Sequence, residues 1–170
     1  MSLNEKHYAR LLRFAGRKPW RGIVLFSCCG LPWLAAVLYG LCCFLQLWRQ
    51  RAIPWPMLAP VAAAFALATV LRRVLPVQRP FRRYGLTPLV PHEDGGSFPS
   101  RHSACAASLV MAVWPAAPRM AILLAVMALF IGLGRVSAAL HAPRDVLGGY
   151  ALGILAGIVL NPSFFGGIIG

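Results

Sequence analysis

Long stretches without charged residues constrain this chain more than any other feature. Residues 22–48, 52–71 and 146–160 contain no Asp, Glu, Lys or Arg. A helix needs roughly 20 apolar residues to cross the hydrocarbon core of a bilayer. The chain is therefore expected to be an integral membrane protein, in agreement with its 59% hydrophobic and 12% charged residues.

Two further apolar stretches bring the expected number of membrane-spanning helices to about five. Residues 103–114 are uncharged but short for a span, and residues 120–140 are interrupted only by Arg135. An ionisable residue inside a span is a candidate functional residue, because burying a charge in a bilayer is costly. We predict an all-α integral membrane helical bundle that forms a single membrane-embedded domain over residues 1–170.

The first 20 residues are polar and basic, and residues 3–15 have the pattern of an amphipathic helix. One face of this helix is formed by Tyr8, Leu11, Leu12 and Ala15. We expect the helix to lie in the membrane interface. A polar start of this length also predicts that the chain has no cleavable signal peptide.

The net charge of +13 raises the possibility of a nucleic-acid partner. The arginines, however, fall at the ends of apolar stretches and not along an aromatic-lined groove, so we expect no nucleic acid. The bilayer itself, its anionic head groups and a lipid phosphate substrate are the expected partners. The adjacent pairs Cys28-Cys29 and Cys42-Cys43 do not have the spacing of a zinc site and are expected to pack within helices.

The chemically versatile residues are concentrated in three short segments, each next to an apolar stretch. They are Arg72-x6-Arg79-Pro80, Pro99-Ser100-Arg101-His102 and Gly134-Arg135-x5-His141-x3-Asp145. Arginine side chains bind phosphate oxygens in pairs and stay ionised. Histidines act as nucleophiles and as general acids. This mixture predicts phosphoryl transfer at one end of the helical bundle.

Two of the segments are predicted to begin helices. Ser100 is a candidate N-cap, and the free amides that follow an N-cap favour a bound anion. Pro143 suits the first position of the last helix, which places Asp145 in the first turn and His141 just before it. A carboxylate at this spacing can orient the imidazole through one ring nitrogen. His141 is therefore the candidate nucleophile, Asp145 its orienting partner and His102 the candidate general acid.

The three segments together resemble the type 2 phosphatidic acid phosphatase superfamily, whose pattern is Lys-x6-Arg-Pro, Pro-Ser-Gly-His and Ser-Arg-x5-His-x3-Asp. The match covers residues 72–145 with the same order and internal spacings. The resemblance implies a phosphohistidine intermediate on His141 and no metal or other cofactor. It also implies phosphate binding by five residues, namely Arg72, Arg79, Ser100, Arg101 and Arg135.

Three residues depart from the family pattern, which has lysine, glycine and serine in place of Arg72, Arg101 and Gly134. Arg72 keeps the positive charge. Arg101 adds a cation beside the phosphate, which favours a diphosphate substrate. A residue other than glycine at this position also resembles the branch of the family that includes bacterial undecaprenyl-diphosphate phosphatases. Gly134 removes a hydroxyl group, but none of the departures removes a catalytic group.

These features predict a metal-independent membrane phosphatase that acts on a lipid phosphate or diphosphate, with undecaprenyl diphosphate as the first choice. A phosphatidate or phosphatidylglycerophosphate lipid is the alternative substrate. The same residues would also serve a lipid phosphotransferase. A non-catalytic lipid-binding protein would need the arginines but not both histidines. A vanadate-dependent haloperoxidase is disfavoured because the chain is small and membranous.

The side of the membrane and the oligomeric state stay open at this level. Of the 17 Lys and Arg residues, 6 precede the first span and 8 surround the three segments, against 3 at the opposite end. This distribution predicts a site on the cytoplasmic side of a bacterial cytoplasmic membrane, whereas the resemblance implies the outer face and six spans. Gly149, Gly153 and Gly157 share a helix face that suits close packing, either within the monomer or between copies.

Overall fold

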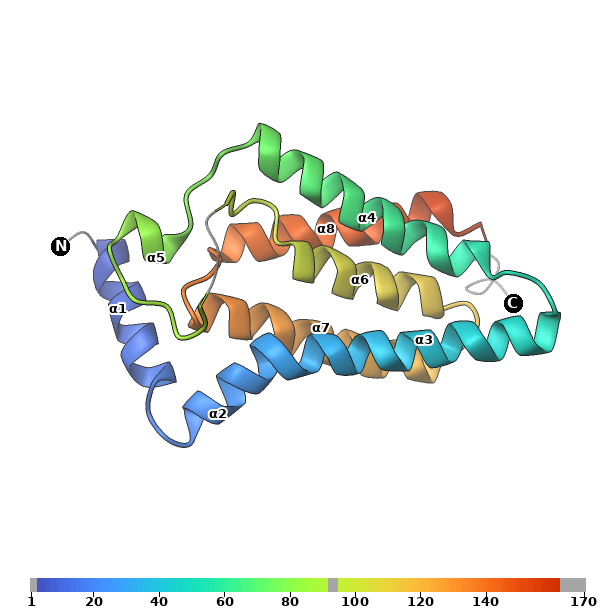
Figure 1. Ribbon diagram of the computed structural model, residues 1–170, viewed down its shortest axis with the longest axis horizontal. Helices are drawn as coiled ribbons and strands as arrows, with labels where there is room; N and C mark the ends of the chain where they lie inside the picture. The colour runs from blue at the N-terminus through green and yellow to red at the C-terminus, as the bar shows by residue number, and fades with distance from the viewer. Residues whose placement is uncertain (1–2, 92–94, 163–170) are drawn as a thin grey trace.

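The computed structural model describes residues 3–91 and 95–162 of the 170-residue chain, and within these ranges it contains helices and no strands. The α-helices are α1 Leu3–Ala15, α2 Trp20–Leu25, α3 Leu31–Gln50, α4 Trp55–Val74, α5 Pro80–Arg83, α6 Arg101–Val113, α7 Pro118–Ser137 and α8 Pro143–Leu160 (Figure 1). A π-helical turn, η1 (Phe26–Gly30), joins α2 to α3 in one continuous helix. The predicted all-α fold is confirmed.

Within residues 3–91 and 95–162, four helices are long and apolar enough to cross a membrane. They are Trp20–Gln50, Trp55–Val74, Pro118–Ser137 and Pro143–Leu160. The remaining predicted span corresponds to α6, which has 13 residues. At 1.5 Å per residue it is about 20 Å long, shorter than the hydrocarbon core of a bilayer. Five membrane crossings therefore stay a prediction.

The short helix α6 lies at the centre of the bundle, where it contacts α3, α4, α7 and α8 (Figure 1). Most of its buried residues are Ser or Ala, and small side chains let neighbouring helices approach closely. On α8, a Cβ added to Gly149 would lie 2.6 Å from the carbonyl oxygen of Ser100. The glycine face of α8 therefore packs against α6 inside the monomer, which is one of the two arrangements expected.

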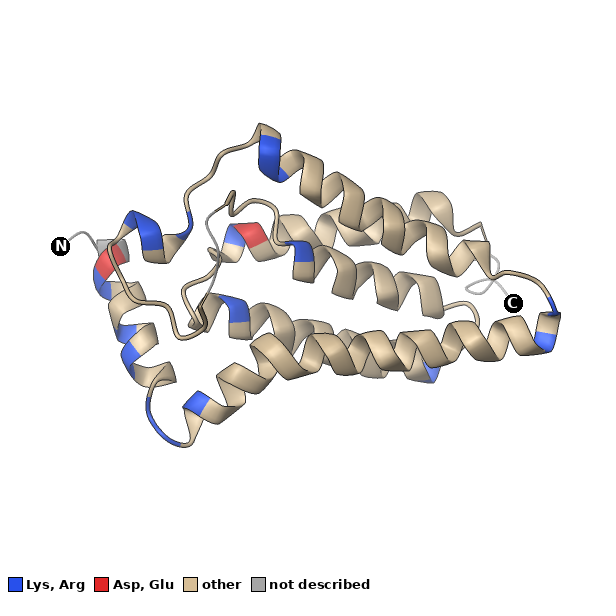
Figure 2. Ribbon diagram, viewed as in Figure 1, with Lys and Arg blue, Asp and Glu red and all other residues tan. Residues whose placement is uncertain are grey.

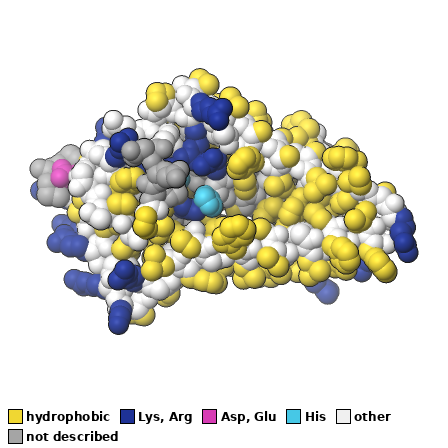
Figure 3. Space-filling view, in the orientation of Figure 1, with side chains coloured by type: hydrophobic (Ala, Val, Ile, Leu, Met, Phe, Trp, Pro, Cys, Tyr) yellow, Lys and Arg dark blue, Asp and Glu magenta, His cyan; other side chains and the backbone are white. Residues whose placement is uncertain are grey.

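Large apolar side chains cover the outward faces of α3, α4, α7 and α8, and Figure 3 shows those on one face of the molecule. Trp33 on α3 is 77% exposed, and Val159 on α8 is 72% exposed. A soluble protein rarely exposes so much apolar surface, whereas lipid tails are a suitable environment for it. The chain is an integral membrane protein, as predicted.

Basic residues lie at the two ends of the bundle and are more numerous at the end that carries α1 and α5 (Figure 2). The predicted amphipathic helix is present as α1, and its Tyr8 and Leu12 pack against a cluster that contains Phe81 and Leu140. The placement of α1 in the membrane interface and the side of the membrane stay predictions. So does a single domain over residues 1–170, because residues 1–2, 92–94 and 163–170 lie outside the described ranges.

Candidate active site

The three segments predicted to form the site meet at one end of the bundle. Helices α4 and α7 end there, and α6 and α8 begin there (Figure 1). The N-terminus of a helix carries a partial positive charge and free amide groups. Two such N-termini beside a group of arginines make this end suitable for an anion.

Ser100 is the N-cap of α6, as predicted. Its hydroxyl oxygen accepts hydrogen bonds from the amide of Ser103, at 3.4 Å, and from the hydroxyl of Ser103, at 3.0 Å. The amide of Ser100 donates to the carbonyl oxygen of Asp145 at 2.8 Å. Ser100 therefore ties the start of α6 to the first turn of α8, and its predicted contact with phosphate stays a proposal.

His141 directly precedes α8 and Asp145 lies in its first turn, as predicted, but a third residue connects them. The distance between Nδ1 of His141 and Oδ2 of Asp145 is 3.8 Å, too long for a direct hydrogen bond. The hydroxyl of Ser97 donates a hydrogen bond to Oδ2 of Asp145 at 2.5 Å and lies 3.3 Å from Nδ1 of His141. Since the Ser97 proton is directed to Asp145, the Ser97 oxygen is free to accept the proton on Nδ1. This arrangement leaves Nε2 of His141 unprotonated.

Burial sets the charge of His141. The side chain is 1% exposed. Burial lowers the pKa of His141 to about 4, with Asp145 acting in the opposite direction and the charge of Arg79 adding to the decrease. The imidazole is therefore neutral at neutral pH, which is the form that a nucleophile requires. The amide of Ala142 donates a further hydrogen bond to Oδ2 of Asp145 at 2.9 Å and so favours the ionised carboxylate.

Arg72 and Arg79 hold the loop that carries Ser97. Nε of Arg72 donates to the carbonyl oxygen of Gly96 at 2.7 Å, and Nε of Arg79 donates to that of Gly95 at 3.4 Å. Arg79 also bonds the carbonyl oxygen of Leu140 through Nη1, at 3.3 Å. The two arginines therefore connect the first segment to the loop before α6 and to the residue before His141.

The arginines of all three segments lie close enough to influence one another. Burial, together with the charges of Arg72, Arg135 and Arg101, lowers the pKa of Arg79 to about 10. Arg79 is nevertheless charged at neutral pH. Several like charges in a buried place are unfavourable unless an anion compensates them. The cluster is thus suited to a multiply charged group such as phosphate.

Arg135 lies near the end of α7 and is 3% exposed. Its Nη2 donates to the main-chain carbonyl of Cys28, in η1 of the first membrane helix, at 3.1 Å. Its Nε is buried and has no hydrogen-bond partner among the described residues. A buried donor without a partner is unfavourable, so this group is ready to bind an acceptor such as a phosphate oxygen.

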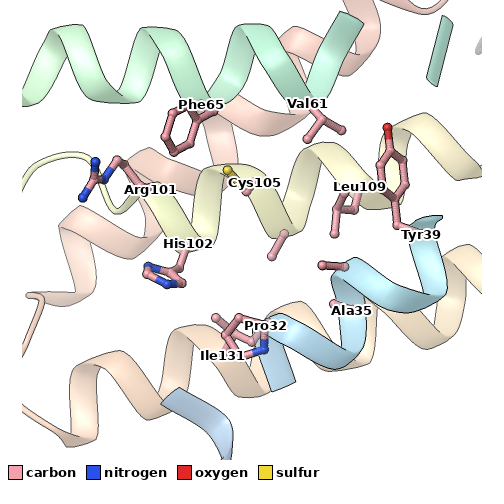
Figure 4. Close-up of a pocket in the computed structure, with 12 residues that line it drawn as sticks. Pro32, Ala35, Tyr39, Val61, Phe65, Arg101, His102, Cys105, Leu109 and Ile131 are labelled. Carbon is pink, nitrogen blue, oxygen red and sulfur yellow. The ribbon is translucent and has the colours of Figure 1, made fainter. Parts of the chain in front are cut away.

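His102 lines two adjoining cavities. One, of about 450 Å³, is also lined by Arg135, Cys28 and Val90. The other, of about 360 Å³, lies between α3, α4, α6 and α7 and is lined mainly by apolar side chains (Figure 4). The two share Pro32 and Ala36 as well as His102, so the cavity that contains Arg135 adjoins the more apolar one.

Arg101 lies at the polar end of the apolar cavity, next to His102 (Figure 4). Its guanidinium carbon is 5.9 Å from the centre of the Phe65 ring on α4, within the range of a cation–π interaction. Arg101 therefore occupies the junction between the apolar cavity and the cluster of cations.

Sequence reasoning did not identify Ser97 or the carbonyl of Cys28 as parts of the site. Ser97 is completely buried, although it lies in a loop rich in Gly and Pro. Its position two residues before the Pro99-Ser100 segment is the one available signal, and it is weak. No side-chain pattern can mark a main-chain carbonyl, so the contact between Arg135 and Cys28 required the tertiary structure.

Comparisons with known proteins agree with the predicted family. A family model described as the PAP2 superfamily matches residues 53–166, more than half of the chain. Lipid A 1-phosphatase of Rhizobium etli is 35% identical over 92 residues, covering 51% of this chain and 40% of that protein. Lipid A 1-phosphatase of Rhizobium johnstonii is 34% identical over 92 residues, covering 51% and 38%. The chain thus spans about two fifths of the length of these curated relatives.

Two solved structures have a similar fold. A transmembrane PAP2-type phosphatidylglycerolphosphate phosphatase from Bacillus subtilis has a TM-score of 0.71 and 24% identity, covering 98% of this chain and 86% of that one. LpxE from Aquifex aeolicus has a TM-score of 0.69 and 25% identity, covering 94% of each chain. Both resemblances extend over nearly the whole of the present chain.

Proposed function

Because this chain belongs to the PAP2 superfamily, we propose that it is a membrane phosphatase that removes a phosphate from a lipid phosphate or diphosphate. One observation carries the proposal: a buried, neutral His141 lies within a cluster of cations that gathers Arg72, Arg79, Arg101 and Arg135 at one end of the bundle. An apolar cavity for a lipid chain begins next to this cluster. A site for soluble phosphate esters would need no such cavity.

In the proposed reaction, Nε2 of His141 attacks phosphorus and the bond from phosphorus to the leaving oxygen breaks. His102 donates a proton to that oxygen, so the lipid leaves as an alcohol or, from a diphosphate, as a monophosphate. His102 then accepts a proton from water, which attacks the phosphohistidine and releases inorganic phosphate. Asp145, acting through Ser97, stabilises the positive charge that develops on His141.

The proposed reaction needs no metal ion. Arg72, Arg79 and Arg135 would bind the oxygens of the phosphate under attack, and fixed cations of this kind stabilise the charge of a phosphoryl-transfer transition state. The N-terminal amides of α6 and α8 would contribute further hydrogen bonds. The observations that support this assignment are the burial of Arg79 and Arg135 and the unpartnered Nε of Arg135.

Undecaprenyl diphosphate remains our first substrate. The apolar cavity supports a substrate with an extended hydrocarbon chain, and Arg101 at its polar end would bind a second phosphate. The name of one solved structure favours phosphatidylglycerophosphate, already an alternative substrate, and the names of the curated relatives add lipid A 1-phosphate. All three combine a phosphate with a hydrocarbon anchor, so one assay can compare them.

The test is phosphate release by the purified protein in detergent with EDTA, for each of the three lipids. We expect release that survives EDTA, is lost in His141→Ala and is retained in a matched control, His7→Ala, on α1. Analysis of the products for free phosphate and for a phosphorylated second lipid distinguishes hydrolysis from phosphoryl transfer. Lack of release from every lipid, or full activity of His141→Ala, would overturn the proposal.

A further inference from the structure

The first membrane helix contains an interruption that faces Arg135. Helix α2 passes into the π-helical turn η1, after which the amide of Leu31 donates to the carbonyl oxygen of Phe26. The next residue is Pro32, which has no amide hydrogen. In an α-helix the amide of residue 32 would donate to the carbonyl of residue 28. Pro32 therefore leaves the carbonyl of Cys28 without its usual helical donor.

Arg135 supplies the missing donor. Its Nη2 lies 3.1 Å from the carbonyl oxygen of Cys28, and both residues are almost completely buried. Buried polar groups are nearly always hydrogen-bonded, and a hydrogen bond from a charged donor is among the stronger ones. The contact thus compensates an acceptor that Pro32 has released and fixes one end of the planar guanidinium.

Gly134 allows this close approach. A Cβ added to Gly134 would lie 2.7 Å from Cβ of Ser27, closer than such atoms approach one another. The family pattern described above has serine at this position. A serine at position 134 would therefore collide with the π-helical turn of the first helix, which packs directly on Gly134.

The remaining donors of Arg135 are left for a ligand. Its Nε has no partner among the described residues, and Arg135, Pro32 and His102 line the same cavity of about 450 Å³. A guanidinium that is held by one amino group presents its other nitrogens in a fixed plane, as bidentate binding of phosphate requires.

We propose that Pro32 is a positioning residue: by removing the usual helical donor to the carbonyl of Cys28, it orients Arg135 toward the phosphate of the substrate. The proposal rests on the phosphate-binding role of Arg135 in the proposed function. Residues 20–50 precede the part of the chain that the family model matches. Under this proposal the first helix positions a phosphate-binding residue and is not only a membrane anchor.

Pro32→Ala tests the proposal, because it restores an amide that competes with Arg135 for the carbonyl of Cys28. We expect kcat/KM to fall about tenfold, which is the effect of losing roughly 1.4 kcal/mol of transition-state stabilisation. Pro60→Ala, which changes a buried proline inside α4, is the matched control and should leave kcat/KM unchanged. An equal effect of the two substitutions would overturn the proposal.

A second measurement distinguishes positioning from general structural damage. In the Arg135→Lys background, Pro32→Ala should add little further loss, because the group that it orients is already altered. The same tenfold loss in both backgrounds would contradict the proposal. Gly134→Ala provides an independent variant that displaces the turn while Pro32 is kept, and it should lower kcat/KM in the same way.

Binding of a phosphate analogue tests the role of Pro32 independently of catalytic turnover. Orthovanadate should raise the melting temperature of the wild-type protein and of Pro60→Ala, and raise it less for Pro32→Ala and Arg135→Lys. If the wild type binds vanadate in this pattern but hydrolyses no lipid, the proposed function fails while the role of Pro32 stands. Equal stabilisation of all four proteins would overturn the role of Pro32.

Discussion

The hydroxyl of Ser97 donates a 2.5 Å hydrogen bond to the carboxylate of Asp145, although 48 residues separate the two in the chain. The same hydroxyl lies 3.3 Å from Nδ1 of His141. Asp145 therefore acts on His141 through Ser97, because its own distance of 3.8 Å from Nδ1 is too long for a hydrogen bond.

Removal of the Ser97 hydroxyl should slow catalysis without weakening substrate binding. In Ser97→Ala the imidazole loses the partner that fixes its tautomer and orientation, so we expect kcat to fall about 10- to 100-fold with KM nearly unchanged. Single-turnover formation of the phosphohistidine should slow by the same factor. Ser108→Ala removes another serine hydroxyl, which bonds a local carbonyl within α6, and is the matched control. A change in KM alone would contradict the role assigned to Ser97.

The role of His102 as general acid predicts that the loss in His102→Ala depends on the leaving group. A lipid alcohol is a poor leaving group that requires a proton, so the rate of phosphohistidine formation should fall about 10²- to 10⁴-fold on a lipid monophosphate. The monophosphate released from a diphosphate is a better leaving group, and the loss should be clearly smaller. Single turnovers of the two substrates in one detergent measure this difference apart from the later attack of water, which is common to both. Equal losses would indicate that His102 only binds the substrate.

Arg101→Gly restores the glycine of the family pattern and should separate diphosphate from monophosphate substrates. Arg101 lies at the junction of the apolar cavity and the cation cluster. We expect kcat/KM for undecaprenyl diphosphate to fall about tenfold more than for the corresponding monophosphate, because only the diphosphate has a second group for this cation. Phe65→Leu, which removes the ring beneath Arg101, should give a weaker effect in the same direction. Equal losses on both substrates would exclude this preference.

The lowered pKa of His141 predicts the pH range in which acid reduces the stability of the protein and the formation of the phosphohistidine. The pKa is about 4 in the folded protein because burial disfavours the charged imidazole, against about 6.5 in an unfolded chain. The unfolded state therefore binds the extra proton more readily, and stability should fall as the pH decreases from about 6.5 toward 4. Phosphohistidine formation in single turnovers should likewise persist at pH 5.5. Loss of this step with a midpoint near 6.5 would show that His141 is solvated.

The helices and their starting points followed from local chemistry in the sequence. Apolar length predicted the four long membrane helices, although their bounds differ from the predicted ones by a few residues. Ser100 before α6 and Pro143 at the start of α8 are capping signals that act within one turn, so they were readable without tertiary contacts. Motif order and spacing indicated the family, which the match over residues 53–166 confirmed.

The central position of α6 and the bounds of the first helix were harder to predict from the sequence. A helix of 13 residues resembles a weak span in a hydropathy pattern, and only its contacts with four neighbours explain why it is buried. The π-helical turn η1 ends two residues before Pro32, and no local pattern in the sequence specified this form of interruption. The form of an interruption depends on what packs against it, and here Gly134 and Arg135 of α7 do so.

From the sequence alone, the residues of the candidate site other than Ser97 could be predicted, whereas the contacts that hold them depend on the tertiary structure. Periodicity, capping and motif spacing act over a few residues and can be read from the order of side chains. The contact between Ser97 and Asp145 spans 48 residues, and that between Arg135 and the carbonyl of Cys28 spans 107. Such contacts depend on the packing of whole helices and, for Cys28, on a backbone group that every residue carries, so no local pattern can specify them.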